Sequence, residues 1–330
     1  MPFPLPVGHK FSCVALANAG VARELRTAID LGDELWVLFE PPFELEGHWR
    51  EWLGTVRAEY LSRANLVVLA HHASATAEVM DAENETLTKK CFSVFYALFV
   101  AEVFHHDGGL ILSGANVHGT VNVRHVSNLE NFYRPNGVNT ARVDAALIQR
   151  ASEIASGMRA VHIPGRHSQR LHRGFQAWIG GAKEFYGQDR LHQFVRAVEG
   201  VIKPAIGQSK RQFVHRGQVL AGNSGAVVKL LGELYDLRGL AEHLHPFDSV
   251  LTTYPVSDRE SIALQRAYQA QILASHVYER IFSTPNLHRT FGTDGAIDAF
   301  WAQTWAQQTQ AWGQPIDLEA TATARFTRPF

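Results

Sequence analysis

The sequence predicts an α+β amino-terminal domain followed by an all-α helical bundle. Runs with strand periodicity end near Val126, and only helical periods continue beyond residue 140. A turn-rich stretch, RPNGVNT at 134–140, lies between the two patterns. The chain has 330 residues, 46% of them apolar, which at about 150 residues per domain is enough for two cores. We therefore expect one domain at 1–138 and a second at 139–330.

Strands are expected at three places in the first domain. ELWVLF at 34–39 is closed by two prolines, NLVVLAH at 65–71 follows a helix, and GLILSG with VHGTVNVRHV forms a hairpin. HWREWLGTVRAEYL at 48–61 repeats apolar residues with a 3.6-residue period, which predicts one helix with one packed face. CFSVFYALFVAEVF at 91–104 is too short for a bilayer span and contains Glu102, so it predicts a buried helix.

The second domain is expected to be helical because short breakers such as IPGR, YGQ and GNSG separate segments with helical periods. Connections this short favour antiparallel neighbours in a bundle. The expected helical segments are 141–157, 168–182, 188–202, 208–221, 226–245, 260–281 and 295–311.

The net charge of −1 hides a basic segment. Between Ile154 and Gly232 the chain has twelve Lys or Arg against three Asp or Glu, a balance of +9, so the remaining residues sum to −10. A basic segment of this length is typical of a surface that neutralises phosphates. The alternative is a solvated helix surface whose cations pair with the acidic remainder.

Composition and motifs exclude several classes of protein. MPFPLPVGHK lacks the layout of a signal peptide, no apolar run is long enough for a membrane, and two cysteines imply no disulfide framework. We expect a cytoplasmic, reduced protein without membrane contact. Phosphate-loop, dinucleotide-binding, zinc-protease and serine-hydrolase motifs do not occur. We expect no cofactor.

Adjacent histidine pairs, His71-His72 and His105-His106, raise the question of metal binding. Neighbouring side chains point in different directions from a strand or a helix, so a pair rarely supplies two ligands to one ion. We expect no metal site, and a metal-dependent hydrolase using these pairs remains a minor alternative.

Candidate catalytic residues gather in LYDLRGLAEHLHPF at 234–247. At about 100° per residue of helix, Arg238, Glu242 and His245 share one face, and His243 points elsewhere unless the helix unwinds. Pro246 disfavours helical geometry at the residue before it, which makes such unwinding plausible. The alternative interpretation is an i,i+4 ion pair between Arg238 and Glu242, with histidines that suit the carboxyl end of the helix dipole.

Arg238 with His243 spells R-x4-H, and Arg238 with His245 spells R-x6-H. Both resemble the Rx4-6H motif of the HEPN superfamily, helical-bundle proteins that include metal-independent ribonucleases. The surrounding helices resemble those of Apea-like HEPN domains, and the resemblance covers roughly residues 165 to 285. Three segments carry it: DRLHQFVRAVEGVIKP (189–204), SKRQFVHRG (209–217) and LYDLRGLAEH (234–243).

The resemblance implies an HEPN-type bundle that cuts RNA, with tRNA among its substrates. It implies that this cleavage serves phage defence, abortive infection or a toxin-antitoxin system. It implies a homodimer with two motifs face to face, and an amino-terminal domain that senses a regulatory partner or a phage-derived trigger. Candidate catalytic residues are Arg238, His243, His245 and Glu242. Candidate RNA-binding residues are Lys210, Arg211, His215 and Arg216.

Arg238 would stabilise the negative charge of the phosphorane-like state. His243 is the first candidate for proton transfer, and His245 is the second. This chain has Gly239 after the motif arginine, where nuclease members often have a polar residue, and spacing does not choose between the two histidines. Some HEPN proteins have lost catalysis, so a noncatalytic binding or antitoxin partner is the alternative function.

Overall fold

A computed structural model gives the chain as two compact units. The described residues are 3–44, 47–161 and 169–326. The first unit comprises Met1–Asn131 with Thr140–Arg159, and the second comprises Phe132–Asn139 with Ala160–Phe330. The predicted boundary between residues 138 and 139 falls where the two units exchange segments, because residues 132–139 belong to the second unit and residues 140–159 belong to the first.

The first unit is built on an antiparallel sheet of six strands in the order β2-β3-β4-β1-β5-β6. Cys13, in the middle of β1, pairs with Leu69 on one side and Leu112 on the other. The predicted strands correspond to β3, β4 and the hairpin β5–β6, whereas the central strand β1 and the edge strand β2 were not predicted. The strands are β1 His9–Ala17, β2 Ile29–Gly32, β3 Leu35–Leu38, β4 Ala64–Ala73, β5 Gly108–Val117 and β6 Thr120–Asn128.

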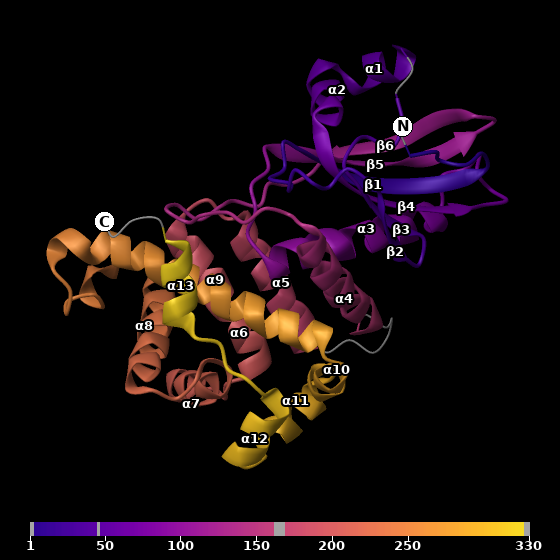
Figure 1. Cartoon of the computed structure of the whole chain (residues 1–330). Coiled ribbons are helices and arrows are strands. Elements are labelled where there is room, and N and C mark those ends of the chain that lie inside the picture. The colour runs from indigo at the N-terminus through magenta and orange to yellow at the C-terminus, as the bar shows by residue number, and fades with distance from the viewer. Residues whose placement is uncertain (1–2, 45–46, 162–168, 327–330) are drawn as a thin grey trace. The chain divides into compact units, whose positions relative to one another are not determined.

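Helices cover both faces of this sheet (Figure 1), with α1 and α2 on one side and α3 on the other. The helices of the unit are α1 Gly47–Leu53, α2 Thr55–Ser62, α3 Ala82–Ala101 and α4 Ala145–Val161. The prediction of one helix over 48–61 is wrong, because the chain breaks at Gly54, whose φ of +77° suits glycine. The expected buried helix at 91–104 is the last part of α3 and ends at Ala101. Among the described helices, none combines the length and the apolar character needed to cross a membrane.

A buried lysine fixes the start of α3 on the sheet. Lys10 of β1 is fully buried, and its Nζ lies 2.6 Å from Asp81 Oδ2 and 3.1 Å from Glu83 Oε2. Asp81 is also the N-cap of α3, where its Oδ1 accepts from the Glu83 backbone N–H at 2.9 Å. The hydrogen bond from Lys10 lowers the pKa of Asp81 to about 2. The charge is thus buried only with a partner, as buried cations require.

The described part of the second unit is helical, as the sequence predicts. The central helix α6 packs against α5, α8 and α9 around buried Trp178, Phe194 and Tyr278. The helices are α5 Gln169–Lys183, α6 Gly187–Ile202, α7 Ser209–Ala221, α8 Gly225–Glu242, α9 Arg259–Ser283, α10 Pro285–Phe291, α11 Asp294–Trp301, α12 Trp305–Trp312 and α13 Leu318–Arg325. Two 3₁₀ turns, Phe247–Ser249 and Val256–Asp258, join α8 to α9. The prediction of one helix over 295–311 is wrong, because Thr304 caps a new helix, α12.

Two glycines let α5 and α6 approach closely. A Cβ added to Gly200 would lie 2.8 Å from the Gly174 Cα and 2.9 Å from the Arg170 carbonyl oxygen. Either side chain would therefore force the helices apart. Tyr278 of α9 anchors the same crossing, since its hydroxyl donates to the Ala197 carbonyl at 2.9 Å.

Candidate functional site

The helix α8 carries the candidate motif to the surface of the second unit. Ser224 is its N-cap, and the Ser224 hydroxyl accepts from the Val227 N–H at 3.3 Å. Leu231, Leu234 and Leu237 are fully buried and hold the helix in the bundle. The packing of these leucines therefore fixes the position of the α8 backbone that carries the motif residues.

The carboxyl end of α8 closes in a Schellman motif. The His245 N–H donates to the Leu240 carbonyl at 2.9 Å, and the Leu244 N–H donates to the Ala241 carbonyl at 3.2 Å. Leu244 takes the left-handed conformation, with φ of +58°, at the position where glycine is usual. The helix thus stops at Glu242, three residues before the predicted end at 245.

This turn brings the two motif histidines together. The ring centroids of His243 and His245 are 6.2 Å apart, and both side chains are exposed. His243 was expected to point elsewhere unless the helix unwinds, and the left-handed residue between the two histidines provides that unwinding. Two imidazoles this close to one another can serve one substrate as proton donor and proton acceptor.

Arg238 lies one turn earlier and is held by two carboxylates. Its Nη1 pairs with Glu242, and its Nη2 lies 3.4 Å from Glu199 Oε2 of α6. The Arg238 side chain is 19% exposed, and its Nε is buried without a hydrogen-bond partner among the described residues. The predicted i,i+4 pair is therefore present. An incoming phosphate would have to replace Glu242, which is the more exposed partner.

Two residues of α6 complete these surroundings, and sequence reasoning missed both roles. Burial raises the pKa of Glu199, although Arg238 opposes the shift. His192 Nδ1 lies 3.4 Å from the Arg238 carbonyl oxygen, and burial lowers the pKa of His192. No local signal links these positions to Arg238, because 39 residues or more separate them in the chain.

The four candidate RNA-binding residues all lie on α7, with different surroundings. Lys210 Nζ pairs with Asp236 Oδ2 at 2.7 Å, and the ring of His215 lies 5.6 Å from that of Trp305. Arg211 is exposed and forms no hydrogen bond or ion pair with a described residue. Arg216 Nη1 donates to the Ile202 and Lys203 carbonyls at 2.7 and 2.8 Å. Arg216 therefore caps the end of α6, which leaves three of the four side chains at the surface.

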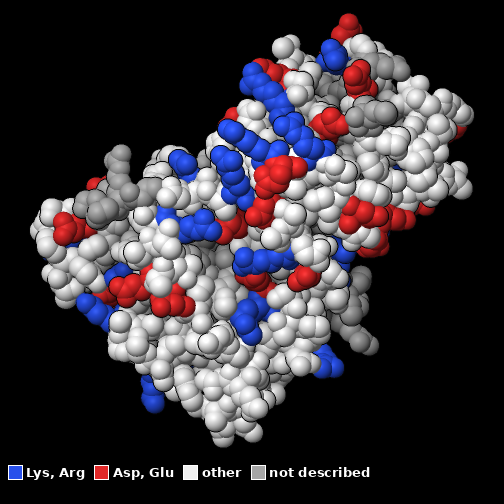
Figure 2. All heavy atoms as spheres, viewed as in Figure 1, with Lys and Arg blue, Asp and Glu red and all other residues white. Residues whose placement is uncertain are grey.

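The predicted basic segment is not one continuous basic surface. Several of its cations are engaged: Lys203 pairs with Asp298 at 2.5 Å, and Arg190 is buried. On the face drawn in Figure 2, acidic side chains are interspersed among the basic ones. Arg166 lies outside the described residues. Ion pairing and burial thus account for part of the positive charge of this segment.

The adjacent histidines do not converge on one point. His71 Nδ1 is 3.0 Å from His9 Nδ1, whereas His72 lies 3.5 Å from each of two carboxylates on the other face of the sheet. His105 Nε2 pairs with Asp107 Oδ1 at 3.0 Å. Over residues 3–44, 47–161 and 169–326, no group of three or more His, Cys, Asp or Glu could hold a metal ion.

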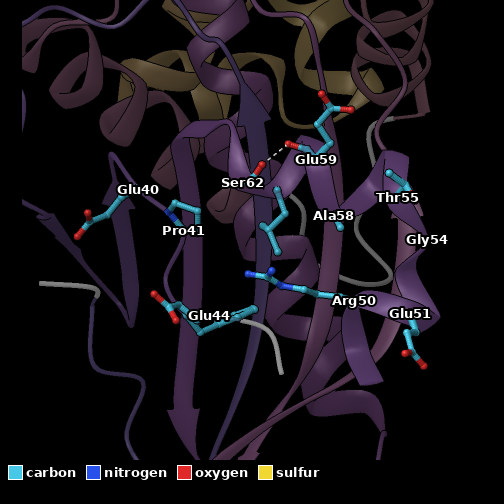
Figure 3. Close-up of a pocket in the computed structure, with 12 residues that line it drawn as sticks. Glu40, Pro41, Glu44, Arg50, Glu51, Gly54, Thr55, Ala58, Glu59 and Ser62 are labelled. Atoms are coloured by element: carbon cyan, nitrogen blue, oxygen red, sulfur yellow. Dashed lines mark hydrogen bonds between the residues drawn. The ribbon is translucent and has the colours of Figure 1, made fainter. Parts of the chain in front are cut away.

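A cavity of about 980 Å³ lies beside α1 and α2 in the first unit. Figure 3 shows Arg50 reaching across it, while the carboxylates of Glu40, Glu51 and Glu59 point in different directions. Binding sites gather a few polar groups on one point. These groups do not converge, so we place the candidate site at α8 instead.

Comparison of the chain with protein-family models, curated proteins and solved structures found no match. The HEPN assignment therefore stays a prediction that rests on the motif and on the three helical segments around it.

Proposed function

We propose that the end of α8 is the active site of a metal-independent endoribonuclease of HEPN type. The observation that carries the proposal is the pair of exposed imidazoles, His243 and His245, with centroids 6.2 Å apart and with Arg238 in the last turns of the helix that precedes them. Proton donors and acceptors near neutral pH beside a guanidinium form the set of groups that phosphodiester cleavage by RNA's own hydroxyl requires.

The chemistry runs through the 2′-hydroxyl of RNA. One imidazole accepts the 2′-hydroxyl proton as the 2′-oxygen bonds to phosphorus, and the other donates a proton to the 5′-oxygen as the P–O5′ bond breaks. The products are a 2′,3′-cyclic phosphate and a 5′-hydroxyl. Arg238 stabilises the negative charge of the phosphorane-like state. Glu242 holds Arg238 in position until the RNA phosphate takes its place.

Other parts of the second unit would hold the RNA. Lys210, Arg211 and His215 present side chains along α7 that suit the phosphate backbone. A second copy of the chain would place another Arg238 and another pair of histidines across the RNA. One arginine and two histidines are few groups for catalysis, and a homodimer would double them. Structured RNA such as tRNA is the expected substrate, with specificity from shape. The first unit would respond to a regulatory partner or a phage-derived trigger.

The test is cleavage of end-labelled structured RNA, tRNA included, in the presence of chelator. Wild type, Arg238→Ala, His243→Ala and His245→Ala are compared with His125→Ala, which removes an exposed histidine of β6 in the first unit. Wild type and the control should leave 2′,3′-cyclic phosphates. Loss of one proton-transfer group should slow cleavage by about 10² to 10⁴.

Two results would overturn the proposal. One is cleavage at the wild-type rate when both histidines are alanine, and the other is fragments that lack cyclic phosphate. If no RNA is cut, growth arrest on expression is measured next. Arrest by wild type and not by Arg238→Ala would indicate a site that needs its trigger.

The pairing of Arg238 with two carboxylates favours a second candidate, a noncatalytic HEPN binding or antitoxin partner. In such a protein Arg238 would join α8 to α6 through Glu199, and the histidines would serve no reaction. RNA or protein binding that is unchanged in His243→Ala and His245→Ala, with no cleavage and no growth arrest, would support this candidate.

A further inference from the structure

We infer that a small cavity between α5 and α6 is a binding site for a phosphate group. The cavity measures about 190 Å³, which is room for an oxyanion, and it lies wholly in the second unit. Its lining residues are Arg170, Arg173, Gly174, Ala177, Arg196, Glu199 and Gly200.

Helix periodicity places the arginines around this cavity, and two glycines line it. Arg170 and Arg173 are three residues apart on α5, and Arg196 stands one turn before Gly200 on α6, so the arginines face the same crossing. Gly174 and Gly200, which let the helix backbones approach closely, also line the cavity.

The cavity collects arginines that have few partners. Arg173 and Arg196 form no hydrogen bond or ion pair with any described residue. Arg170 has one long contact from Nη2, 3.5 Å to the Glu199 carbonyl, and its Nε is buried without a partner in the described part of the chain. Each guanidinium has five N–H donors, so described residues of the protein take up few of the donors around the cavity.

Several other cations of the same unit are engaged by protein groups. Lys203 pairs with Asp298, Lys210 pairs with Asp236, and Arg216 caps α6. The one acid that lines the cavity, Glu199, lies 3.4 Å from Arg238 and also interacts electrostatically with Arg196 and Arg170, so one carboxylate faces three lining arginines. The cavity therefore keeps an excess of positive charge.

Phosphate is the ligand that matches these groups. Guanidinium forks bind phosphate oxygens in bidentate pairs, and a dianion relieves the repulsion among three like charges. The phosphate could belong to an RNA backbone or to a free phosphorylated small molecule, and the recognition chemistry is the same. The cavity would bind phosphate whether or not His243 and His245 cleave RNA, so the two proposals fail separately.

The test is calorimetric titration of the full chain with inorganic phosphate and pyrophosphate, with sodium chloride of equal ionic strength as the blank. Wild type is compared with the double variant Arg173→Ala/Arg196→Ala and with Arg289→Ala. Arg289 is an exposed arginine of α10 in the same unit, and it does not line the cavity. Both sites of the double variant are exposed, so it should fold, and a melting curve checks this.

Wild type and Arg289→Ala should bind one anion per chain, and the double variant should bind at least about tenfold more weakly. No heat beyond the chloride blank, or equal affinity in the double variant, would overturn the inference. Glu199→Gln supplies a result of opposite sign, because removing the only lining carboxylate should tighten anion binding. Weaker binding by a folded Glu199→Gln would also count against a phosphate site.

Competition then identifies the source of the phosphate. If pyrophosphate displaces single-stranded RNA from wild type at constant ionic strength, and the double variant loses this RNA affinity, the cavity holds an RNA phosphate. If ATP binds the cavity more tightly than inorganic phosphate does and RNA does not compete, the cavity holds a free phosphorylated small molecule.

Discussion

Replacement of Arg190 by methionine should destabilise the second unit more than any surface substitution. Arg190 on α6 is 3% exposed, and its guanidinium donates to three acceptors. Nη1 reaches the Tyr133 and Glu184 carbonyls at 2.9 Å each, and Nη2 reaches Gln271 Oε1 at 2.7 Å. Methionine fills a similar volume and leaves all three acceptors without their donor.

The expected loss follows from these acceptors. Each acceptor stranded in the interior costs about 1–3 kcal/mol, and the two carbonyls, which are only partly buried, belong at the low end. Relief of the buried charge offsets part of the cost, so we expect a net loss of about 3 kcal/mol. At about 2–4 °C per kcal/mol for a unit of this size, the melting temperature should fall by roughly 6–12 °C.

Circular dichroism melts of wild type and Arg190→Met measure this loss. Arg211→Met is the matched control, because Arg211 is exposed and without a described partner, and its change should stay within about 0.5 kcal/mol. Equal melting temperatures for Arg190→Met and Arg211→Met would refute the reasoning that buried arginine bonds stabilise α6.

Three further predictions concern other parts of the chain. Leu244→Gly should be more stable than Leu244→Ala by about 1 kcal/mol in urea unfolding, since φ is +58° there; equal stability would mean that the left-handed turn is unstrained. Burial lowers the pKa of His9 and of His71 below 6.5, so as pH falls below about 6.5 the unfolded chain binds protons that the folded chain does not. Stability should therefore be constant above that pH and fall below it in melts, and a double His9→Asn/His71→Asn variant with the same pH slope would contradict this. Burial raises the pKa of Cys13 to about 12 and that of Cys91 well above its ordinary value, so a thiol reagent should label neither in the native chain and both in denaturant.

The sequence predicts the α+β and all-α character of the two regions well, because the spacing of apolar residues that distinguishes strands from helices is visible within short segments. The hairpin β5–β6 and helices such as α6 have the repeats that their environments require. The strand β1 escaped prediction because it is central and buried on both faces, so it lacks alternation, and the buried polar Lys10 and Ser12 interrupt its apolar run. Their partners on α3 are about 70 residues away and leave no local trace.

The candidate site was predicted in part. The spacing of Arg238 and Glu242 is enough to predict their ion pair. The meeting of His243 and His245 depends on one residue in the left-handed region, and leucine there gives no signal that glycine would have given. The contact of Arg238 with Glu199 is tertiary, so only the fold shows it.

The exchange of segments between the two units limits how the chain can be divided. The backbone passes from one unit to the other three times, after residues 131, 139 and 159. A fragment that stops at residue 138 would lack α4, whose Ile148, Ala151 and Ile154 are fully buried. A fragment that starts there would lack most of the segment in which the Tyr133 carbonyl accepts from Arg190. A single cut leaves one unit whole only inside a longer fragment, since residues 1–159 contain all of the first unit and residues 132–330 contain all of the second. In either case the other unit loses one of its segments, so no single cut yields both units intact.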